Sequence, residues 1–182
     1  IIDQLPLSSD NILISNGSAA AIDNVCTTLI DPGDVIIAEG PTWHGFLRTA
    51  NGHLADLVQV PVDNSGILVD KVEAEIKAAE VSKKKVKFIY IISDFQNPSG
   101  KTMSSKRRRD LLEICAEHHV LILEDSAYSE LHFGPDTPSS IYSLADGNGV
   151  LKIGSFSKII ATGLRIGWIQ GKVELIGALT NT

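Results

Sequence analysis

The sequence predicts an α/β fold in three layers, α/β/α, with a mostly parallel β-sheet between two layers of helices. Short apolar runs rich in Val, Ile and Leu alternate along the chain with segments whose apolar residues recur at helical spacing. Polar clusters follow the apolar runs, where a parallel sheet places its ligand-binding loops. The length of 182 residues suits one domain, so we expect residues 1–182 to form a single unit.

Strands are expected at the short apolar runs. The run at 86–92 is strongly β-prone, which is typical of a strand buried on both faces of a sheet. A turn is expected at 63–66, where Asp, Asn, Ser and Gly follow one another. The expected strands are 12–14, 35–38, 54–60, 86–92, 121–123, 150–153 and 166–169.

Helices are expected where apolar residues recur three and four positions apart. The first begins at Ala19, has Ile22, Val25 and Leu29 on one face, and ends before Pro32. Further helices are expected at 47–50, at 68–76, from Ser104 or Ser105 to His119, and from Val173 to Leu179.

The composition excludes several classes of function. The chain is 43% hydrophobic and 21% charged, which is ordinary for a globular protein, and its net charge of −6 argues against nucleic acid as a main partner. Cys26 and Cys115 fall in helical apolar stripes, so we expect neither a disulfide framework nor a metal site. No apolar run approaches a membrane span, and residues 1–10 lack the features of a signal peptide, so we expect a cytoplasmic protein without membrane contact.

The stretch 154–158 follows an expected strand and carries Lys158 between serine hydroxyls and a distant arginine. Partial burial and a nearby cation would favour the neutral lysine amine, which can attack an aldehyde. The hydroxyls of Ser155 and Ser157, with Arg165 seven positions beyond the lysine, form a suitable set for holding a phosphate. Aldehyde and phosphate together describe pyridoxal 5′-phosphate (PLP). The alternative is a solvated lysine in a polar loop.

A second anion site is expected where the first helix begins. The small residues Gly17, Ser18 and Ala19 would let an anion approach backbone N–H groups that have no partner within the helix. The alternative is simply a capped helix, with Ser18 as its N-cap.

Seven motifs occur in one order along the chain, and together they resemble the fold-type-I, class I/II PLP-dependent aminotransferases. The resemblance covers residues 12–171 and is nearest to the aminoadipate and aromatic-type subgroup, whose fold is shared by the effector domains of MocR-type regulators. The motifs are Gly17-Ser18-Ala19, Asp31-Pro32-Gly33-Asp34, Glu39-Gly40-Pro41-Thr42-Trp43, Asn97-Pro98-Ser99-Gly100, Glu124-Asp125-Ser126-Ala127-Tyr128, Ser155-Phe156-Ser157-Lys158 and Gly163-Leu164-Arg165-Ile166-Gly167.

The resemblance implies a role for each residue around the cofactor ring. Lys158 would form an aldimine with PLP and then act as general base and acid at the substrate α-carbon. Asp125 would pair with the ring nitrogen and keep it protonated, so that the ring can accept electrons. Asn97 and Tyr128 would hydrogen-bond the phenolic oxygen, and Trp43 would stack on the ring face.

The resemblance also implies a phosphate cradle, and the residues themselves leave simpler roles open. Asp125 could cap the end of a strand, Asn97 could form the turn before proline, Tyr128 and Trp43 could pack in the core, and Arg165 could form a surface salt bridge. The implied cradle consists of backbone N–H groups of Ser18 and Ala19 beside Gly17, the hydroxyls of Ser155 and Ser157, and the Arg165 guanidinium.

The chain departs from the family pattern in two motifs and in extent. Ala19-Ala20 stands where relatives usually have two glutamines, and Thr162 stands where proline is common. The family's N-terminal arm, and its C-terminal small domain with the arginine that binds the substrate carboxylate, have no counterpart in the sequence. We therefore expect a partial chain, the PLP-binding large domain alone.

The resemblance implies an aminotransferase that passes an amino group between an L-amino acid and a 2-oxo acid, and that works as a homodimer. A PLP-dependent lyase or decarboxylase on the same scaffold is an alternative, because the cofactor cradle would be shared. A PLP-binding sensor domain of a MocR-type transcription regulator is a further alternative, and an inactive fragment is the last.

Overall fold

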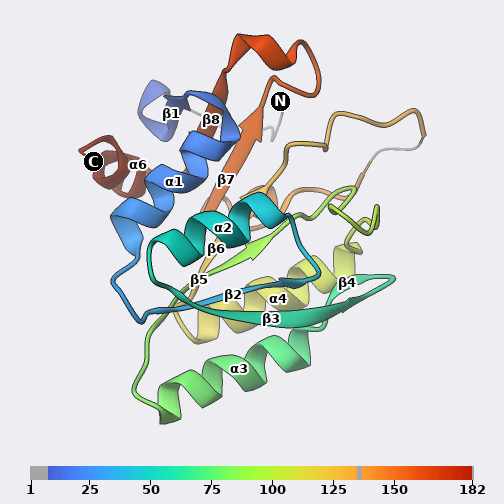
Figure 1. Cartoon of the computed structure of the whole chain (residues 1–182). Coiled ribbons are helices and arrows are strands. Elements are labelled where there is room, and N and C mark those ends of the chain that lie inside the picture. Colours follow the sequence, from blue (N-terminus) through green and yellow to red (C-terminus); the bar gives the residue numbers. More distant parts are fainter. Residues whose placement is uncertain (1–7, 135–136, 182) are drawn as a thin grey trace.

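The computed structural model describes residues 8–134 and 137–181 (Figure 1). Residues 1–7, which belong to the segment compared with signal peptides, lie outside the described residues. The described strands form one sheet in the order β1-β8-β7-β6-β5-β2-β3-β4. Their bounds are β1 (Ile12–Ser15), β2 (Val35–Gly40), β3 (Asp56–Asp63), β4 (Gly66–Ile67), β5 (Val86–Ile91), β6 (Leu121–Asp125), β7 (Val150–Ser155) and β8 (Gly167–Gln170).

The sheet is mostly parallel, as predicted. Strands β3, β2, β5, β6 and β7 run in one direction, while β8 is antiparallel to both of its neighbours, β7 and β1. A short hairpin pairs β4 with β3. Because β8 runs against β7, the chain enters β8 at the same edge of the sheet where β5, β6 and β7 end. That edge collects the loops that carry the predicted site.

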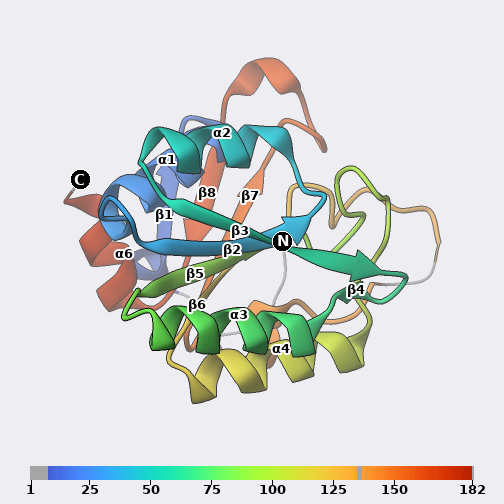
Figure 2. The same cartoon turned by 60° about the horizontal axis from the view of Figure 1, so that its bottom comes forward.

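Helices cover both faces of the sheet, which confirms the three-layer α/β/α fold (Figure 2). α1, α2 and α6 bury apolar residues such as Ile22, Phe46 and Ile176 against one face. α3, α4 and α5 bury Ile76, Leu111 and others against the opposite face. The bounds are α1 (Gly17–Leu29), α2 (His44–Gly52), α3 (Val69–Val81), α4 (Ser105–Glu117), α5 (Ile141–Leu144) and α6 (Val173–Thr180), with 3₁₀ turns η1 (Ser9–Asn11) and η2 (Thr162–Leu164).

No helix within residues 8–134 and 137–181 is long and apolar enough to cross a membrane.

The first helix begins earlier than its apolar pattern predicts. It starts at Gly17 instead of Ala19, so the N-cap position belongs to Asn16, and Ser18 is not the N-cap. The turn from β1 into α1 places Gly17 at a φ of +80°, a region that glycine enters without steric cost. A Cβ on Gly17 would also lie 2.7 Å from Nη2 of Arg165. The start of α1 is therefore set by the backbone turn at Gly17 and by the close approach of Arg165. The spacing of apolar residues carries no information on either.

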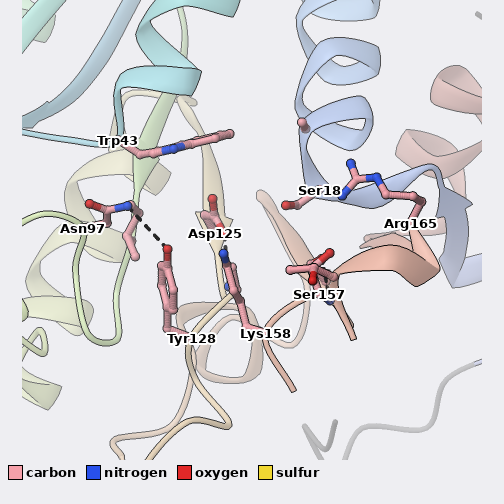
Figure 3. Close-up of a pocket in the computed structure, with 13 residues that line it drawn as sticks. Ser18, Trp43, Asn97, Asp125, Tyr128, Ser157, Lys158 and Arg165 are labelled. Carbon is pink, nitrogen blue, oxygen red and sulfur yellow. Dashed lines mark hydrogen bonds between the residues drawn. The ribbon is translucent and has the colours of Figure 1, made fainter. Parts of the chain in front are cut away.

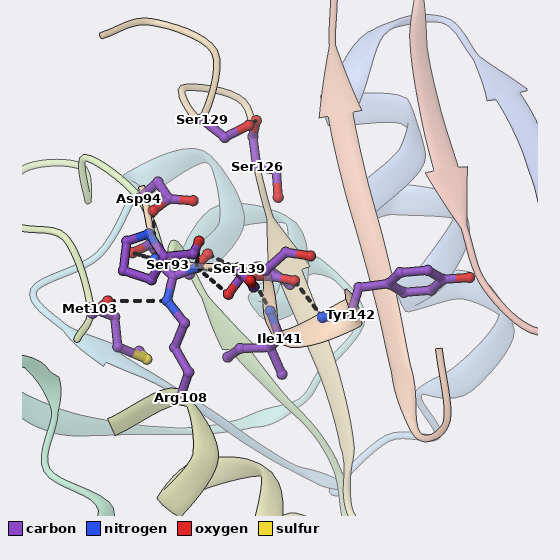
Figure 4. A network of polar contacts seen from close by, with 12 residues as sticks. Ser93, Asp94, Met103, Arg108, Ser126, Ser129, Ser139, Ile141 and Tyr142 are labelled. Carbon is purple, nitrogen blue, oxygen red and sulfur yellow. Dashed lines mark hydrogen bonds and ion pairs between the residues drawn. The ribbon is translucent and has the colours of Figure 1, made fainter. Parts of the chain in front are cut away.

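A buried arginine holds together the loops behind the predicted site (Figure 4). The Arg108 side chain is fully buried, and its Nη2 donates to the Asp94 carboxylate at 2.5 Å and to the carbonyl of Ser93 at 3.0 Å. Its Nη1 also lies 4.0 Å from Glu124. The guanidinium donates further to the backbone carbonyls of Met103, Pro138 and Ser139.

Glu124 extends this network to the next strand. Its fully buried carboxylate accepts hydrogen bonds from the Ser93 hydroxyl at 2.6 Å and from the backbone N–H groups of Ile141 and Tyr142 at 3.0 Å each. Ser93 leads into the loop that carries Asn97, and Glu124 directly precedes Asp125. The network therefore fixes the carboxyl ends of β5 and β6 relative to each other.

Replacing Arg108 with alanine should destabilise the chain by about 3–5 kcal/mol, because two buried carboxylates would lose their cation. The free energy of unfolding, measured by urea denaturation, checks this value. Arg109→Ala is the matched control, since the neighbouring arginine is exposed. A loss for Arg108→Ala that equals the loss for Arg109→Ala would contradict the bracing role.

Candidate active site

A cavity of about 260 Å³ lies at the edge of the sheet where the parallel strands end (Figure 3). It gathers side chains from the loops after β2, β5, β6 and β7 and from the start of α1. Every residue predicted for the site lines it except Gly17, and Ile92, Ala127 and Thr162 line it in addition. The full lining is Ser18, Ala19, Trp43, Ile92, Asn97, Asp125, Ala127, Tyr128, Ser155, Ser157, Lys158, Thr162 and Arg165.

A second cavity of about 290 Å³ lies at the opposite edge of the sheet, beside the start of β6. Its walls include Leu112, Val120 and Leu121, together with His119 and Cys115. Burial raises the pKa of the Cys115 thiol to about 12, so this thiol stays protonated near neutral pH. The arrangement of amine, carboxylate and guanidinium belongs to the first cavity.

Lys158 enters the cavity from the segment between β7 and β8. Its Nζ lies 5.9 Å from the centre of the Tyr128 ring, and the Tyr128 hydroxyl accepts a hydrogen bond from Nδ2 of Asn97 at 3.4 Å. The sequence interpretation expected partial burial of Lys158, whereas the lysine is exposed. The reason is that residues 158–166 lie outside both apolar cores.

Trp43 lies on the other side of the cavity from Lys158 and Tyr128 (Figure 3). It directly precedes α2, and its indole lies so close over Gly45 that a Cβ there would be 2.2 Å from Cζ2 of the indole. A glycine at this position therefore makes room for the indole. The half-buried ring presents a flat surface to the cavity.

Asp125 is the buried acid of the cavity and is 5% exposed. Its Oδ2 accepts a hydrogen bond from the Tyr90 hydroxyl at 2.7 Å, and its Oδ1 accepts one from the backbone N–H of Ala127 at 3.1 Å. Burial raises the pKa of the Asp125 carboxyl, and these two hydrogen bonds oppose the rise. The hydrogen bond with Ala127 is the capping role that the sequence left open for Asp125. Asp125 has this role and also lines the cavity.

Tyr90 is a residue that the sequence interpretation missed, because it was counted only as part of an apolar strand. It is fully buried on β5, where its ring stacks on Phe46 with centroids 3.8 Å apart. A buried tyrosine hydroxyl requires a hydrogen-bond partner, and this requirement was the available signal.

The opposite end of the cavity is rich in donors. The Ser157 Oγ is buried and has no hydrogen-bond partner within the described residues, while the Ser155 Oγ accepts from the Ser157 N–H at 3.1 Å. The Arg165 guanidinium lies over Gly17, which explains why Gly17 stands behind the lining instead of in it. The first turn of α1, with Ser18, adds helix N–H groups. An orphaned hydroxyl, a guanidinium and a helix N-terminus together suit a bound anion.

Glu39, which stands in one of the seven sequence motifs but has no role predicted from the sequence, joins two of the cavity loops. Its carboxylate is 1% exposed and accepts hydrogen bonds from a backbone N–H just after β5 at 2.9 Å and from Nε2 of Gln96 at 3.4 Å. The same Nε2 donates to the Pro41 carbonyl at 2.7 Å. Burial raises the pKa of Glu39 to about 8. The loop that carries Trp43 is thereby joined to the loop that carries Asn97.

Comparisons with known proteins place this chain among aminotransferases. The chain is 38% identical, over 175 residues, to the aromatic-amino-acid aminotransferase 1 of Thermococcus litoralis, covering 96% of this chain and 42% of that protein. It is similar to the structure of a Pyrococcus horikoshii kynurenine aminotransferase solved with PMP, with a TM-score of 0.90 and 36% identity over 95% of this chain and 43% of that one.

A third relative is named as a transcriptional regulator and not as an aminotransferase. The HTH-type transcriptional regulator YjiR of Escherichia coli is 30% identical over 164 residues, which cover 91% of this chain and 34% of that protein. The chain thus spans less than half the length of each of these relatives. The family model for aminotransferase class I and II matches residues 2–182, and the chain therefore belongs to the class I and II aminotransferase family.

Proposed function

We propose that this chain is the cofactor-binding domain of a PLP-dependent aminotransferase, which transfers an amino group between an L-amino acid and a 2-oxo acid. The observation that carries the proposal is the single cavity shared by Lys158, Asp125 and Arg165, of which Asp125 ends β6 and the other two lie on the segment between β7 and β8. The family membership and the PMP-bound structural neighbour support the same cofactor.

The residues present fit PLP at both ends of the cavity. An amine that can bond an aldehyde is at one wall, and the orphaned Ser157 hydroxyl with the Arg165 guanidinium offers donors for a phosphate. When bound, PLP supplies an electron sink for the electron pair left at the substrate α-carbon. The protein residues have the tasks of holding the cofactor, orienting it and moving protons.

Lys158 has two tasks in this proposal. Its Nζ would hold the cofactor through the aldehyde carbon, and as a free amine it would carry a proton to and from the substrate α-carbon. Asn97 and Tyr128, which are hydrogen-bonded to each other at 3.4 Å, would hydrogen-bond the ring oxygen. The flat indole of Trp43 would pack against the cofactor ring and help to orient it.

Asp125 and the hydrogen-bond donors around Arg165 would hold the cofactor at its two ends, the ring nitrogen and the phosphate. The buried Asp125 carboxylate would pair with the ring nitrogen and keep it protonated, and the low dielectric of the site would strengthen this ion pair. Ser155, Ser157 and Arg165, with the first N–H groups of α1, would hold the phosphate. The planar fork of arginine can make two parallel hydrogen bonds to a phosphate, which lysine cannot copy.

A second candidate function is a PLP-binding sensor domain of a MocR-type transcription regulator. The match to the Escherichia coli regulator is the observation that favours it. The cofactor cavity would be the same in both cases, so binding of PLP does not separate them. Amino transfer to a 2-oxo acid by the whole protein would support the enzyme, whereas sequence-specific DNA binding without turnover would support the regulator.

We also propose that the protein acts in the cytoplasm; the two buried free cysteines, Cys26 and Cys115, are consistent with a reducing compartment, and fractionation of cells tests this localisation.

Removing the Lys158 amine should abolish covalent capture of PLP. After incubation with PLP and reduction with borohydride, the native chain should gain the mass of one phosphopyridoxyl group, and Lys158→Ala should gain none. Mass spectrometry checks this result. Lys71→Ala, which changes an exposed lysine on α3, should be labelled like the native chain. Label retained at full level in Lys158→Ala would show that the proposed attachment point is wrong.

Arg165 should matter for the phosphate and not for the ring. Arg165→Ala should weaken PLP binding by about tenfold or more, since hydrogen bonds to charged groups contribute about 1.5–3 kcal/mol. Arg165→Lys should fall between the native chain and the alanine variant. Titrations followed by fluorescence, with PLP and with phosphate-free pyridoxal, measure both affinities. An equal loss for the two ligands would argue against a phosphate contact.

A homodimer should cover the exposed segment that carries Lys158. Ile160 is 68% exposed and Leu164 is 48% exposed, and covering such apolar side chains is favourable. Sedimentation equilibrium should therefore give a dimer for the native chain and a shift toward monomer for Ile160→Glu. Val81→Glu, at an even more exposed apolar site on α3, should leave the dimer intact. A monomeric native chain would refute this assembly.

A further inference from the structure

We propose that Tyr90 is a positioning residue for the reaction, which holds the Asp125 carboxylate in its ionised form and in line with the ring nitrogen of the cofactor. The inference rests on the proposed function, and it adds a residue that does not line the cavity. Tyr90 acts through Asp125, and through its hydroxyl alone.

The first support is the geometry of the contact. The Tyr90 hydroxyl donates to Oδ2 of Asp125 at 2.7 Å, the usual length of a good hydrogen bond between oxygens. The other carboxylate oxygen is held by the N–H of Ala127 at 3.1 Å. The two donors thus reach both oxygens of the carboxylate, which fixes its plane.

The second support is that Tyr90 cannot easily move. Its side chain is fully buried, and its ring lies 3.8 Å from the Phe46 ring at an interplanar angle of 5°. Phe46 belongs to α2, which begins directly after Trp43. One short helix therefore positions both the residue proposed to cover the cofactor ring and the residue that supports Asp125.

The third support is electrostatic. A hydrogen bond donated to a carboxylate favours its charged form, and burial favours its neutral form. At Asp125 burial raises the pKa of the carboxyl, and the Tyr90 hydroxyl is the larger of the two hydrogen-bond effects that oppose it. Without that hydroxyl, the proton shared with the cofactor would move from the ring nitrogen to Asp125, and the ring would lose its positive charge.

Other titratable groups lie near Tyr90 and Asp125 and contribute to the electrostatic potential there. Glu39 on β2 and Tyr128 after β6 both act on Tyr90, and Lys158 lies beside Tyr128. Burial and the neighbouring Asp125 raise the pKa of Tyr90 far above its ordinary value, so the hydroxyl keeps its proton and remains a donor. None of these neighbours replaces the contact at Oδ2, since the described hydrogen bonds to Asp125 come from Tyr90 and Ala127.

The test replaces Tyr90 with phenylalanine and reads the ring nitrogen directly. PLP labelled with ¹⁵N in the ring is bound to the 182-residue chain. The ¹⁵N chemical shift of the ring nitrogen is then followed between about pH 6 and pH 9. The native chain should show a protonated nitrogen throughout. Tyr90→Phe should show a shift toward the unprotonated nitrogen and about tenfold weaker PLP binding.

Tyr142→Phe is the matched control, because it removes another buried tyrosine hydroxyl from outside the cavity. It should leave both the ¹⁵N shift and the affinity as in the native chain. In an Asp125→Asn background, Tyr90→Phe should cause no further loss of affinity, because the carboxylate through which Tyr90 acts is gone. A further tenfold loss in that background would assign Tyr90 a role that is independent of Asp125 and would overturn the proposal.

The proposal is also overturned if folded Tyr90→Phe shows the native ¹⁵N shift and an affinity within about twofold of the native chain, which is the scatter expected between independent substitutions. If circular dichroism and urea denaturation show that Tyr90→Phe is not folded, the same measurements are made on Phe46→Leu. It keeps the hydroxyl and loosens the ring, so it should move the ¹⁵N shift in the same direction by a smaller amount; an unchanged shift would contradict us. Failure of the native chain to bind PLP would instead refute the proposed function.

Discussion

Four carboxylates are buried at the edge of the sheet where β2, β5 and β6 end, and the loops at this edge are arranged by the hydrogen-bond donors that these carboxylates require. Glu39, Asp94, Glu124 and Asp125 are all at most 5% exposed. A buried carboxylate without partners costs several kcal/mol, so each must be supplied with donors. Arg108 serves Asp94 and lies within 4.0 Å of Glu124, and backbone N–H groups and hydroxyls serve the rest. The cavity is the space left between loops that are held in this way.

The same requirement gives neighbouring acids different states. Glu39 accepts from a backbone N–H and from the Gln96 amide, and both donors reach Oε2. Burial outweighs them and raises the pKa of Glu39 to about 8, so its neutral form predominates at pH 7. Asp125 has a phenol donor from Tyr90 and faces the cavity, where a cationic ring nitrogen can neutralise it. Glu39 on β2 and Asp125 on β6, two acids at the same edge of one sheet, can thus serve different purposes: Glu39 joins loops, and Asp125 holds a charge.

The parts of this structure that the sequence predicts are those with local signals. Apolar runs and helical spacing predict the strands and the layers, and the motifs predict that Lys158 and Asp125 meet, because the loops after parallel strands share an edge. Tyr90 and Arg108 were missed because their roles depend on partners 35 and 14 residues away, which no spacing rule connects. The alternative that Ser18 is the N-cap of the first helix is wrong, because the backbone of the preceding glycine, and not side-chain preference, decides where α1 begins. The short elements β4 and α5 have too few residues to show any period.

The antiparallel pairing of β7 and β8 explains how Lys158 and Arg165, seven positions apart in the sequence, come to line opposite ends of one cavity. β7 and β8 are paired antiparallel, and the N–H of Phe156 donates to the Ile166 carbonyl at 3.0 Å, which closes the base of the connecting segment. Lys158 and Arg165 stand just beyond that base, one on each arm, while Ile160 lies on the exposed part between them. Both chemically important residues are therefore positioned by a backbone hydrogen bond just beyond the ends of β7 and β8, although the segment between them has little core of its own. Had β8 run parallel to β7, the chain would have needed a crossover, and Arg165 would have entered the sheet at the opposite edge, away from the lysine.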